Sequence, residues 1–343
     1  MRRTREHFTL TEYLLFAAVT AAVFCLCVCA GSVRIPLGST LRIVRAALLG
    51  LPQEAAGSTV SILLSVRIPR VICVALSGAA LSLAGAAMQG LLKNPLADGS
   101  TLGVSSGASL GAVIAIVTGI RFPSLPFAGT MVMAVLFAFG SLLLILGLAY
   151  RLDGSLSTNT IILVGVIFSM FVSSVLNVII TFSSEKIRSI TFWTMGSLQG
   201  STMTNAAVLG GALLLGSIVL LRLARELNAF AVGEENAGHI GVDLKRTKLT
   251  VLITVSVVIG VCVSIGGTIA FVGLVTPHMV RLLVGPNHKK LLPASLFGGA
   301  VFLMLSDLTA RVLLNPIELP IGVVTSIVGS VVFVIIFWRS RRR

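Results

Sequence analysis

The chain has 343 residues, of which 56% are hydrophobic and 11% charged, with a mean hydropathy of +1.03. A soluble domain carries about 25% charged residues, so this composition excludes a water-soluble globule and predicts an all-α integral membrane protein. The net charge of +14 would suit a nucleic-acid-binding protein, but the basic residues lie mainly between and beyond the apolar segments. That placement is typical of membrane topology and of contact with anionic lipid, and it excludes nucleic acid as a partner.

About ten transmembrane helices are expected, because apolar segments recur along the whole chain. In chain order they cover residues 13–32, 68–92, 103–119, 127–150, 159–182, 205–224, 249–268, 271–284, 294–311 and 319–338. The first segment is too long for a typical signal-peptide core, so it predicts a first spanning helix. With the N-terminus in the cytoplasm, most of the 26 lysines and arginines fall on the cytoplasmic side. This bias predicts that both termini are cytoplasmic.

Three connections are longer than a turn. Residues 33–66 are expected outside and look amphipathic, and residues 183–204 are expected outside with an interfacial helix. Residues 225–248 are expected inside, and they combine acidic and basic residues with apolar ones in short pieces broken by glycine. A solvated loop has no need of exposed apolar residues, so this segment favours a docking surface for a cytoplasmic partner.

The segment KNPLADGSTLGVSSGAS, residues 93–109, interrupts the helical pattern. Asn94-Pro95 breaks a helix, and the glycines and serines that follow allow close backbone contact. The segment is either a tight cytoplasmic turn or part of a pathway, since broken helices inside a membrane are tolerated where they line a cavity. Residues 82–95 also resemble residues 264–277, which suggests the inverted repeat common in transporters.

No catalytic constellation stands out, and nothing predicts a metal site or a cofactor held by this chain. The sequence has no HExxH motif, and no lysine follows a glycine, so it has no Walker A loop. If transport uses ATP, another chain supplies the ATPase. Asp307 and Arg311 are four residues apart and can pair on one helix face, with Glu318 close behind. They are either a structural pair or functional groups near the membrane.

Seven motifs in chain order resemble the FecCD-type permeases, the membrane subunits of ABC importers for iron–siderophore, haem and vitamin B12. They are RIPR (67–70), AGAAMQGLLKNPLA (84–97), LGVSSGAS (102–109), VGEENAGHIGV (232–242), FVGLVTPHMVR (271–281), LPASLFGGA (292–300) and ELPIGVVTSIVG (318–329). The resemblance extends from about residue 12 to 338. One departure is Gly99, where the family usually has proline, so this loop is expected to be more flexible.

The resemblance implies a single permease domain, residues 1–343, with the ten-helix fold of type II ABC importers. It also implies a second permease chain (a copy or a paralogue), two ATP-binding subunits and an extracytoplasmic binding protein, in the plasma membrane of a bacterium or archaeon.

Specific residues receive roles from the same resemblance. The ATPase-coupling residues would be Ala231, Gly233, Glu234, Glu235, Ala237 and Gly241. The translocation path and gate would include Gln89, Asn94, Leu96, Thr158 and Asn159. By analogy with vitamin B12 permeases of the family, Arg67, Arg70 and Arg311 would form external pockets for acidic residues of the binding protein. Exposed ion pairs are individually weak, about 0–1 kcal/mol, so several converging pairs would set register and association rate.

The function expected from these observations is inward movement of an intact metal chelate by alternating access, without bond chemistry in this chain. Iron–siderophore is the commonest substrate class in the family, and haem and vitamin B12 remain open. A different class of protein, an ion-coupled secondary transporter, would need intramembrane acids as coupling sites. Asp307 and Glu318 are its only candidates.

Overall fold

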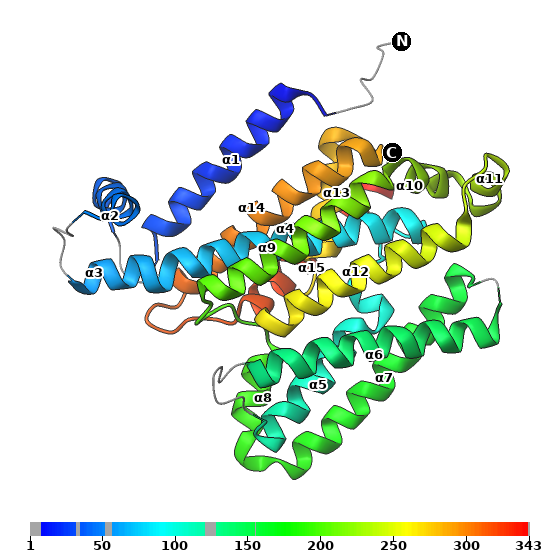
Figure 1. Ribbon diagram of the computed structural model, residues 1–343, viewed down its shortest axis with the longest axis horizontal. Coiled ribbons are helices and arrows are strands. Elements are labelled where there is room, and N and C mark those ends of the chain that lie inside the picture. The colour runs from blue at the N-terminus through cyan, green and yellow to red at the C-terminus, as the bar shows by residue number, and fades with distance from the viewer. Residues whose placement is uncertain (1–7, 32–34, 52–56, 121–127, 155, 342–343) are drawn as a thin grey trace.

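The computed structural model of the chain describes residues 8–31, 35–51, 57–120, 128–154 and 156–341 (Figure 1). The longer helices run roughly alongside one another, and shorter helices lie at their ends. The α-helices are α1 Leu10–Cys29, α2 Leu37–Leu49, α3 Gly57–Ser61, α4 Ile68–Leu92, α5 Val104–Thr118, α6 Ala128–Leu152, α7 Thr158–Phe182, α8 Ile187–Thr194, α9 Met203–Arg222, α10 Ala224–Val232, α11 Glu234–His239, α12 Leu244–Gly266, α13 Val272–Val284, α14 His288–Val312 and α15 Ile321–Arg341. A π-helical segment, η1 Ile62–Arg67, joins α3 to α4, and η2 Gly99–Leu102 and η3 Ser184–Lys186 are short 3-10 helices.

The ten predicted spanning segments are all helices. Within the described residues, seven helical segments are long and apolar enough to cross a membrane, one of them the continuous stretch Gly57–Leu92 that ends with α4. Helices α5, α13 and the described part of α15 are shorter apolar helices. The predicted all-α membrane fold is therefore confirmed. Helices α12 and α14 begin earlier than predicted, because the side chains of Asp243 and Asn287 accept hydrogen bonds from backbone N–H groups of their first turns. Such N-caps extend a helix into polar sequence that hydropathy alone does not assign to it.

The connections between the spans also contain helices, as predicted for 183–204 and 225–248; for 33–66 only amphipathic character was predicted. The segment 33–66 contains α2, the segment 183–204 contains α8, and the segment 225–248 contains α10 and α11. Glycine separates the last two, since Gly233 has φ +150°, a region that residues with a side chain rarely adopt.

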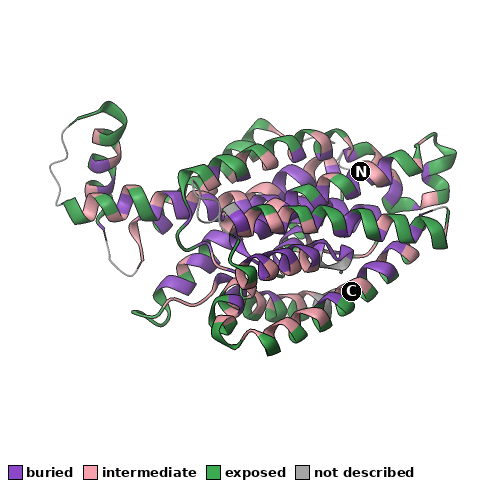
Figure 2. Cartoon of the chain, turned by 60° about the horizontal axis from the view of Figure 1, so that its bottom comes forward, coloured by how far each residue is buried: buried purple, intermediate pink, exposed green. Residues whose placement is uncertain are grey.

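Helix α4 forms the centre of the molecule. Its most apolar stretch is 83% buried, against 22% for α7 and 11% for α1, and Figure 2 shows the buried residues concentrated on the inner helices. Small residues make this possible: a Cβ on Gly78 would collide with the backbone of Gly299 in α14, and a Cβ on Gly85 with that of Gly273 in α13. Close backbone contact through small residues is how membrane helices pack tightly.

The two similar segments, 82–95 and 264–277, contact each other through Gly85 and Gly273. In 82–95 helix α4 continues to Leu92, whereas in 264–277 helix α12 ends at Gly266 and α13 begins at Val272. Corresponding positions of the two segments therefore differ in local structure, and the repeat stays a prediction. Gly99 begins η2, where an added Cβ would meet the side chain of Ile259.

Candidate functional site

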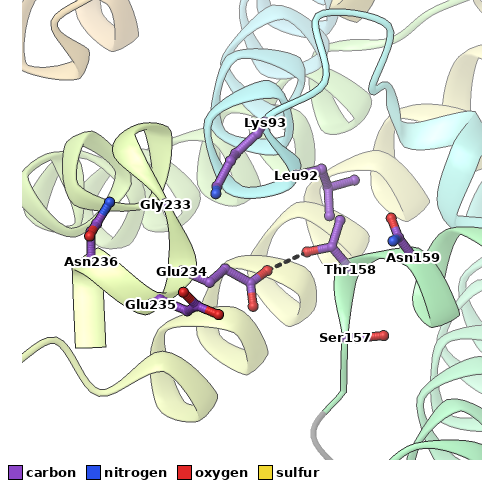
Figure 3. A pocket seen from close by; sticks show the side chains of 9 residues that line it. All are labelled: Leu92, Lys93, Ser157, Thr158, Asn159, Gly233, Glu234, Glu235 and Asn236. Atoms are coloured by element: carbon purple, nitrogen blue, oxygen red, sulfur yellow. Dashed lines mark hydrogen bonds between the residues drawn. The ribbon is translucent and has the colours of Figure 1, made fainter. Parts of the chain in front are cut away.

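A cavity of about 440 Å³ lies where the end of α4, the start of α7 and α11 meet (Figure 3). Its walls are Leu92, Lys93, Ser157, Thr158, Asn159, Gly233, Glu234, Glu235 and Asn236. Two groups of residues that the sequence placed in different roles meet here. Thr158 and Asn159 were predicted for the gate, and Gly233, Glu234 and Glu235 for ATPase coupling. We call this space the gate–coupling cavity.

The start of α7 is fixed by side chains just before it. The Ser157 hydroxyl accepts a hydrogen bond from the backbone N–H of Thr160, which caps the helix. The Asp153 carboxylate in turn accepts from the backbone N–H of Ser157 at 3.2 Å. An N-cap of this kind satisfies donors that the helix leaves unpaired. It therefore fixes the first turn of α7, which carries Thr158 and Asn159, at the edge of the cavity.

Glu234 joins three elements through its carboxylate. The Thr158 hydroxyl donates to Glu234 Oε1 at 2.7 Å (Figure 3), and Lys248 Nζ donates to Glu234 Oε2 at 2.6 Å. Lys248 Nζ also donates to the carbonyl of Leu156 at 3.1 Å. Since the Lys248 side chain is only 4% exposed, its charge requires such partners. The Glu234 link thus connects α11 to the start of α7 and to α12.

The protonation of Glu234 reflects this setting. Burial by itself raises the pKa of the Glu234 carboxyl, but the hydrogen bonds from Lys248 and Thr158 outweigh burial and hold the pKa below its usual value. Hydrogen bonds to the charged form favour that form. The link is therefore ionised at neutral pH.

The surface beside this link is apolar in part. Val232 at the end of α10 is 74% exposed, and Ile240 just after α11 is 73% exposed. Of the other predicted coupling residues, Ala231 and Gly241 are exposed, whereas Ala237 is buried and packs α11 against the rest of the molecule. Large exposed apolar side chains on a segment rich in charges indicate an interface.

The remaining predicted gate residues lie away from the gate–coupling cavity. Asn94 and Leu96 form the turn after α4, where the Asn94 side chain accepts from the backbone N–H of Leu96, and Leu96 is 47% exposed. Gln89 is buried between helices. Its amide donates to the carbonyls of Gly273 and Leu274 in α13, and its oxygen accepts from Arg281 at 3.1 Å. Gln89 therefore holds α4 against α13 in this structure.

At the opposite end of α4, the three predicted docking arginines come together as one arginine cluster. Arg70 contacts Asp307 at 2.9 Å and Glu318 at 2.7 Å. Arg311 Nε lies 2.8 Å from Asp307 Oδ2, which confirms the predicted pair on one helix face.

The expectation that these arginines are exposed is wrong. Arg67, Arg70 and Arg311 are 5%, 6% and 3% exposed. Besides the two carboxylates, they use backbone carbonyls at the end of α1: Arg67 donates to those of Val28 and Cys29, and Arg311 to those of Cys27 and Ala30. Helix ends leave carbonyls unpaired, so the arginines also cap α1. Their role in docking a binding protein stays a prediction.

Two features of these sites were not predicted. No partner for Lys248 was predicted, although a lysine in the early turns of a spanning helix indicates that one exists. Nor was a partner predicted for Glu318, which meets Arg70 from 248 residues away.

Comparison with known proteins gives a consistent result. The model of the FecCD transport family matches residues 19–339. The chain is 40% identical over 337 residues to the ABC transporter permease protein YvrB of Bacillus subtilis, covering 96% of this chain and 94% of that protein. It is 38% identical to the cobalamin import system permease protein BtuC of Halobacterium salinarum, covering 83% of this chain and 74% of that protein.

Two further similarities concern a haem transporter and a solved structure. The chain is 35% identical to the hemin transport system permease protein HmuU of Yersinia pestis, covering 82% of this chain and 84% of that protein. It is also similar to the structure of a metal-chelate type ABC transporter in an inward-facing conformation. That comparison has a TM-score of 0.82 at 29% identity and covers 96% of this chain and 100% of that one.

Proposed function

Because this chain belongs to the FecCD transport family of ABC transporter permeases, we propose that it is the membrane-spanning subunit of an importer that moves an intact metal chelate inward. The substrate class we propose is iron–siderophore complexes. Haem and vitamin B12 are the alternatives, since relatives named for hemin and cobalamin transport are similar over most of this chain. The mechanism is alternating access driven by ATP hydrolysis in a separate chain.

The observation that carries this proposal is the Glu234 link. It joins α11, in the segment expected to dock on an ATPase, to Thr158, which is expected at the cytoplasmic gate. Movement of α11 on ATP binding or hydrolysis would pull directly on the start of α7, because charge-assisted hydrogen bonds are strong and directional. The exposed side chains of Val232 and Ile240 supply an apolar contact for the same partner.

The assembly we propose has two ATP-binding subunits, a second permease chain and an extracytoplasmic binding protein. The proposed location is the plasma membrane of a bacterium or archaeon, with both termini in the cytoplasm. Arg67, Arg70 and Arg311 remain the candidates for the binding-protein contact. With Asp307 and Glu318 they form a cluster of three positive and two negative groups. An incoming carboxylate would compete with Glu318, the more exposed acid, for Arg70.

An ion-coupled transporter is the rival proposal. Its two candidate acids, Asp307 and Glu318, are paired with arginines in the arginine cluster. Acids held by fixed positive charges are poorly suited to bind and release a coupling ion. Uptake that stops on ATP depletion and persists with an uncoupler would support the importer, and the reverse result would support the rival.

The first test is purification of the tagged chain from its native host in mild detergent, with mass spectrometry of the proteins that co-purify. We expect an ATPase at about twice the amount of each permease in a heterodimer, or at equal amount in a homodimer. Val232→Asp together with Ile240→Asp should remove the ATPase, because both substitutions put charge into the proposed apolar contact.

The matched control is Leu48→Asp, which changes an 81% exposed residue of α2, a non-spanning helix expected on the outer side. It should leave the ATPase bound. Recovery of the chain without any nucleotide-binding partner in several detergents would contradict the proposal.

A further inference from the structure

A second cavity, of about 260 Å³, lies among the spanning helices, between α5, α7 and α12 and the segment 268–270 that precedes α13. Six residues with hydroxyl groups line it: Ser105, Ser106, Ser109, Ser169, Ser173 and Thr268. Its remaining walls are mainly aliphatic, as in Val172, Ile259 and Val263. We call it the hydroxyl cavity. A pocket for a whole drug-sized ligand is larger, about 300–1,000 Å³, so this one would take only the edge of a chelate.

Three of the six hydroxyl groups offer oxygen lone pairs rather than protons. The Ser109 hydroxyl donates to the carbonyl of Ser105 at 2.9 Å, and the Ser169 hydroxyl donates to that of Gly165 at 2.9 Å. The Thr268 hydroxyl donates to the carbonyl of Thr194. A hydroxyl has one proton and two lone pairs. Since these three protons are committed to the backbone, the oxygens can only accept hydrogen bonds from a ligand.

The charge of the lining also favours a ligand with hydrogen-bond donors or positive charge. Asp98 is the one charged residue among the described residues that line the hydroxyl cavity. Helices α5 and α7 contain no charged residue at all, so a second copy of the chain facing α7 would add none from that helix. A negative ligand here would lose hydration and meet acceptors and a carboxylate, which is unfavourable in a low-dielectric site. A ligand with N–H or O–H donors, or with positive charge, meets complementary groups.

The polar lining continues along α7 beyond the cavity. Ser169, Ser173, Asn177 and Thr181 are spaced four residues apart, so they follow one side of the helix. Ser173, Asn177 and Thr181 are exposed, on a helix whose most apolar stretch is only 22% buried. Polar side chains inside a membrane are costly unless they face a polar path. The stripe therefore indicates that this side of α7 faces a path and not lipid.

Building on the proposed function, we propose that the hydroxyl cavity is a chelate-contact site selective for charge. It takes the periphery of a neutral or cationic chelate that presents N–H or O–H donors, as amide-bearing trihydroxamate complexes do, and disfavours anionic chelates such as tris-catecholates and haem with its carboxylates. The selection arises from the acceptor-rich wall and Asp98.

The test is equilibrium binding of radioiron chelates to the full-length chain in lipid nanodiscs. The probes are the ferric complex of a linear trihydroxamate with a free amine, which is cationic, and a ferric tris-catecholate, which is anionic. We expect the cationic probe to bind at least about tenfold more tightly. Ser173→Lys puts a positive charge at the cavity. It should lower the ratio of the affinity for the cationic probe to that for the anionic probe about tenfold.

The matched control is Ser174→Lys. Ser174 is the next residue of the same helix, is also exposed, and lies outside the cavity lining. It should leave the ratio within about twofold. Ser173→Asp makes the opposite change and should widen the ratio. It provides the comparison if the lysine variant does not fold.

Equal binding of the two probes by the unmodified chain would overturn the inference, as would equal shifts from Ser173→Lys and Ser174→Lys. So would failure of both probes, or of the cationic probe alone, to bind while ATP-dependent uptake continues in cells. These results leave the importer itself standing, because the co-purified ATPase and the ATP dependence of uptake are measured separately. Absence of both of those would remove the importer, and the charge selection with it.

Discussion

The two ends of this molecule use charged residues in different ways. In the arginine cluster, Arg70 and Asp307 are 7% and 1% exposed at their side chains, and three arginines satisfy two carboxylates and the end of α1. In the Glu234 link, one carboxylate holds one lysine and one hydroxyl, and its side chain is 30% exposed beside an open cavity. A buried charge cannot lose its partner without a large penalty, whereas a half-exposed charge can exchange its partner for water. The arginine cluster is therefore the more firmly held of the two, whereas in the Glu234 link the carboxylate has access to water although Lys248 is only 4% exposed.

The largest effect is expected from Asp307→Asn in the arginine cluster. The substitution keeps the shape but removes the carboxylate charge between Arg70 and Arg311. Breaking a buried pair costs about 3–5 kcal/mol, and we expect a loss of this order in the free energy of unfolding, measured in detergent or bicelles. Glu318→Gln is the control, since Glu318 is 24% exposed and leaves Arg70 still paired with Asp307. Equal losses from the two variants would show that burial does not govern this cluster.

A smaller loss in the free energy of unfolding is expected from Arg67→Ala. The substitution removes the guanidinium that donates hydrogen bonds to the carbonyls of Val28 and Cys29. Hydrogen bonds to a charged group contribute about 1.5–3 kcal/mol, and the end of α1 should loosen accordingly. The measurement is the rate at which a membrane-impermeant maleimide labels Cys29, together with thermal stability. Arg42→Ala, at an exposed position of α2, is the control. Unchanged labelling in Arg67→Ala would show that the arginine does not hold α1.

In the Glu234 link, Glu234→Gln should reduce ATP-dependent uptake more than it reduces the stability of the chain. Glu234 is 30% exposed, but its partner Lys248 is only 4% exposed and keeps the Leu156 carbonyl and an uncharged amide as acceptors. The loss in the free energy of unfolding should therefore be about 1–2 kcal/mol, below that of the arginine cluster. ATP-dependent uptake should fall several-fold, since α11 no longer pulls on α7 through a charged bond. Glu235→Gln changes the neighbouring carboxylate of the same cavity and is the control. A double-mutant cycle with Thr158→Val would test the contact itself, and fully additive losses of uptake would contradict the proposed coupling.

The smallest effect is the pH dependence of the same link. The folded-state pKa of Glu234 lies below its usual value, so the unfolded chain binds this proton at higher pH than the folded chain. The Glu234 link therefore stabilises the folded chain fully at pH values above the usual pKa of a glutamate. This stabilisation is lost as the pH falls through the lowered pKa of the folded chain. The stability difference between the unmodified chain and Glu234→Gln should be present at pH 7 and shrink below about pH 4. A difference that stays constant would assign the effect to packing and not to charge.

Much of the fold could be predicted because it depends on local sequence. Apolar segments of spanning length predicted every long helix, and glycine at position 233 predicted the break between α10 and α11. The starts of α12 and α14 were misplaced because their caps, Asp243 and Asn287, lie in polar sequence. Several residues of the gate–coupling cavity and of the arginine cluster were named in advance from motifs in chain order, and the roles given to them stay predictions.

The sequence by itself determined that this chain is a bundle of membrane helices with short helices in the polar segment 225–248. The length of an apolar segment and the position of a helix breaker act within a few turns of the chain, so both can be read locally. Only the tertiary structure decided that Thr158 meets Glu234 from 76 residues away, and that Arg70 meets Asp307 from 237 residues away inside the molecule. It also decided that scattered serines of α5 and α7 share one cavity. Burial and partner choice depend on how helices pack, and that packing follows from contacts between distant segments, such as Gly85 against Gly273.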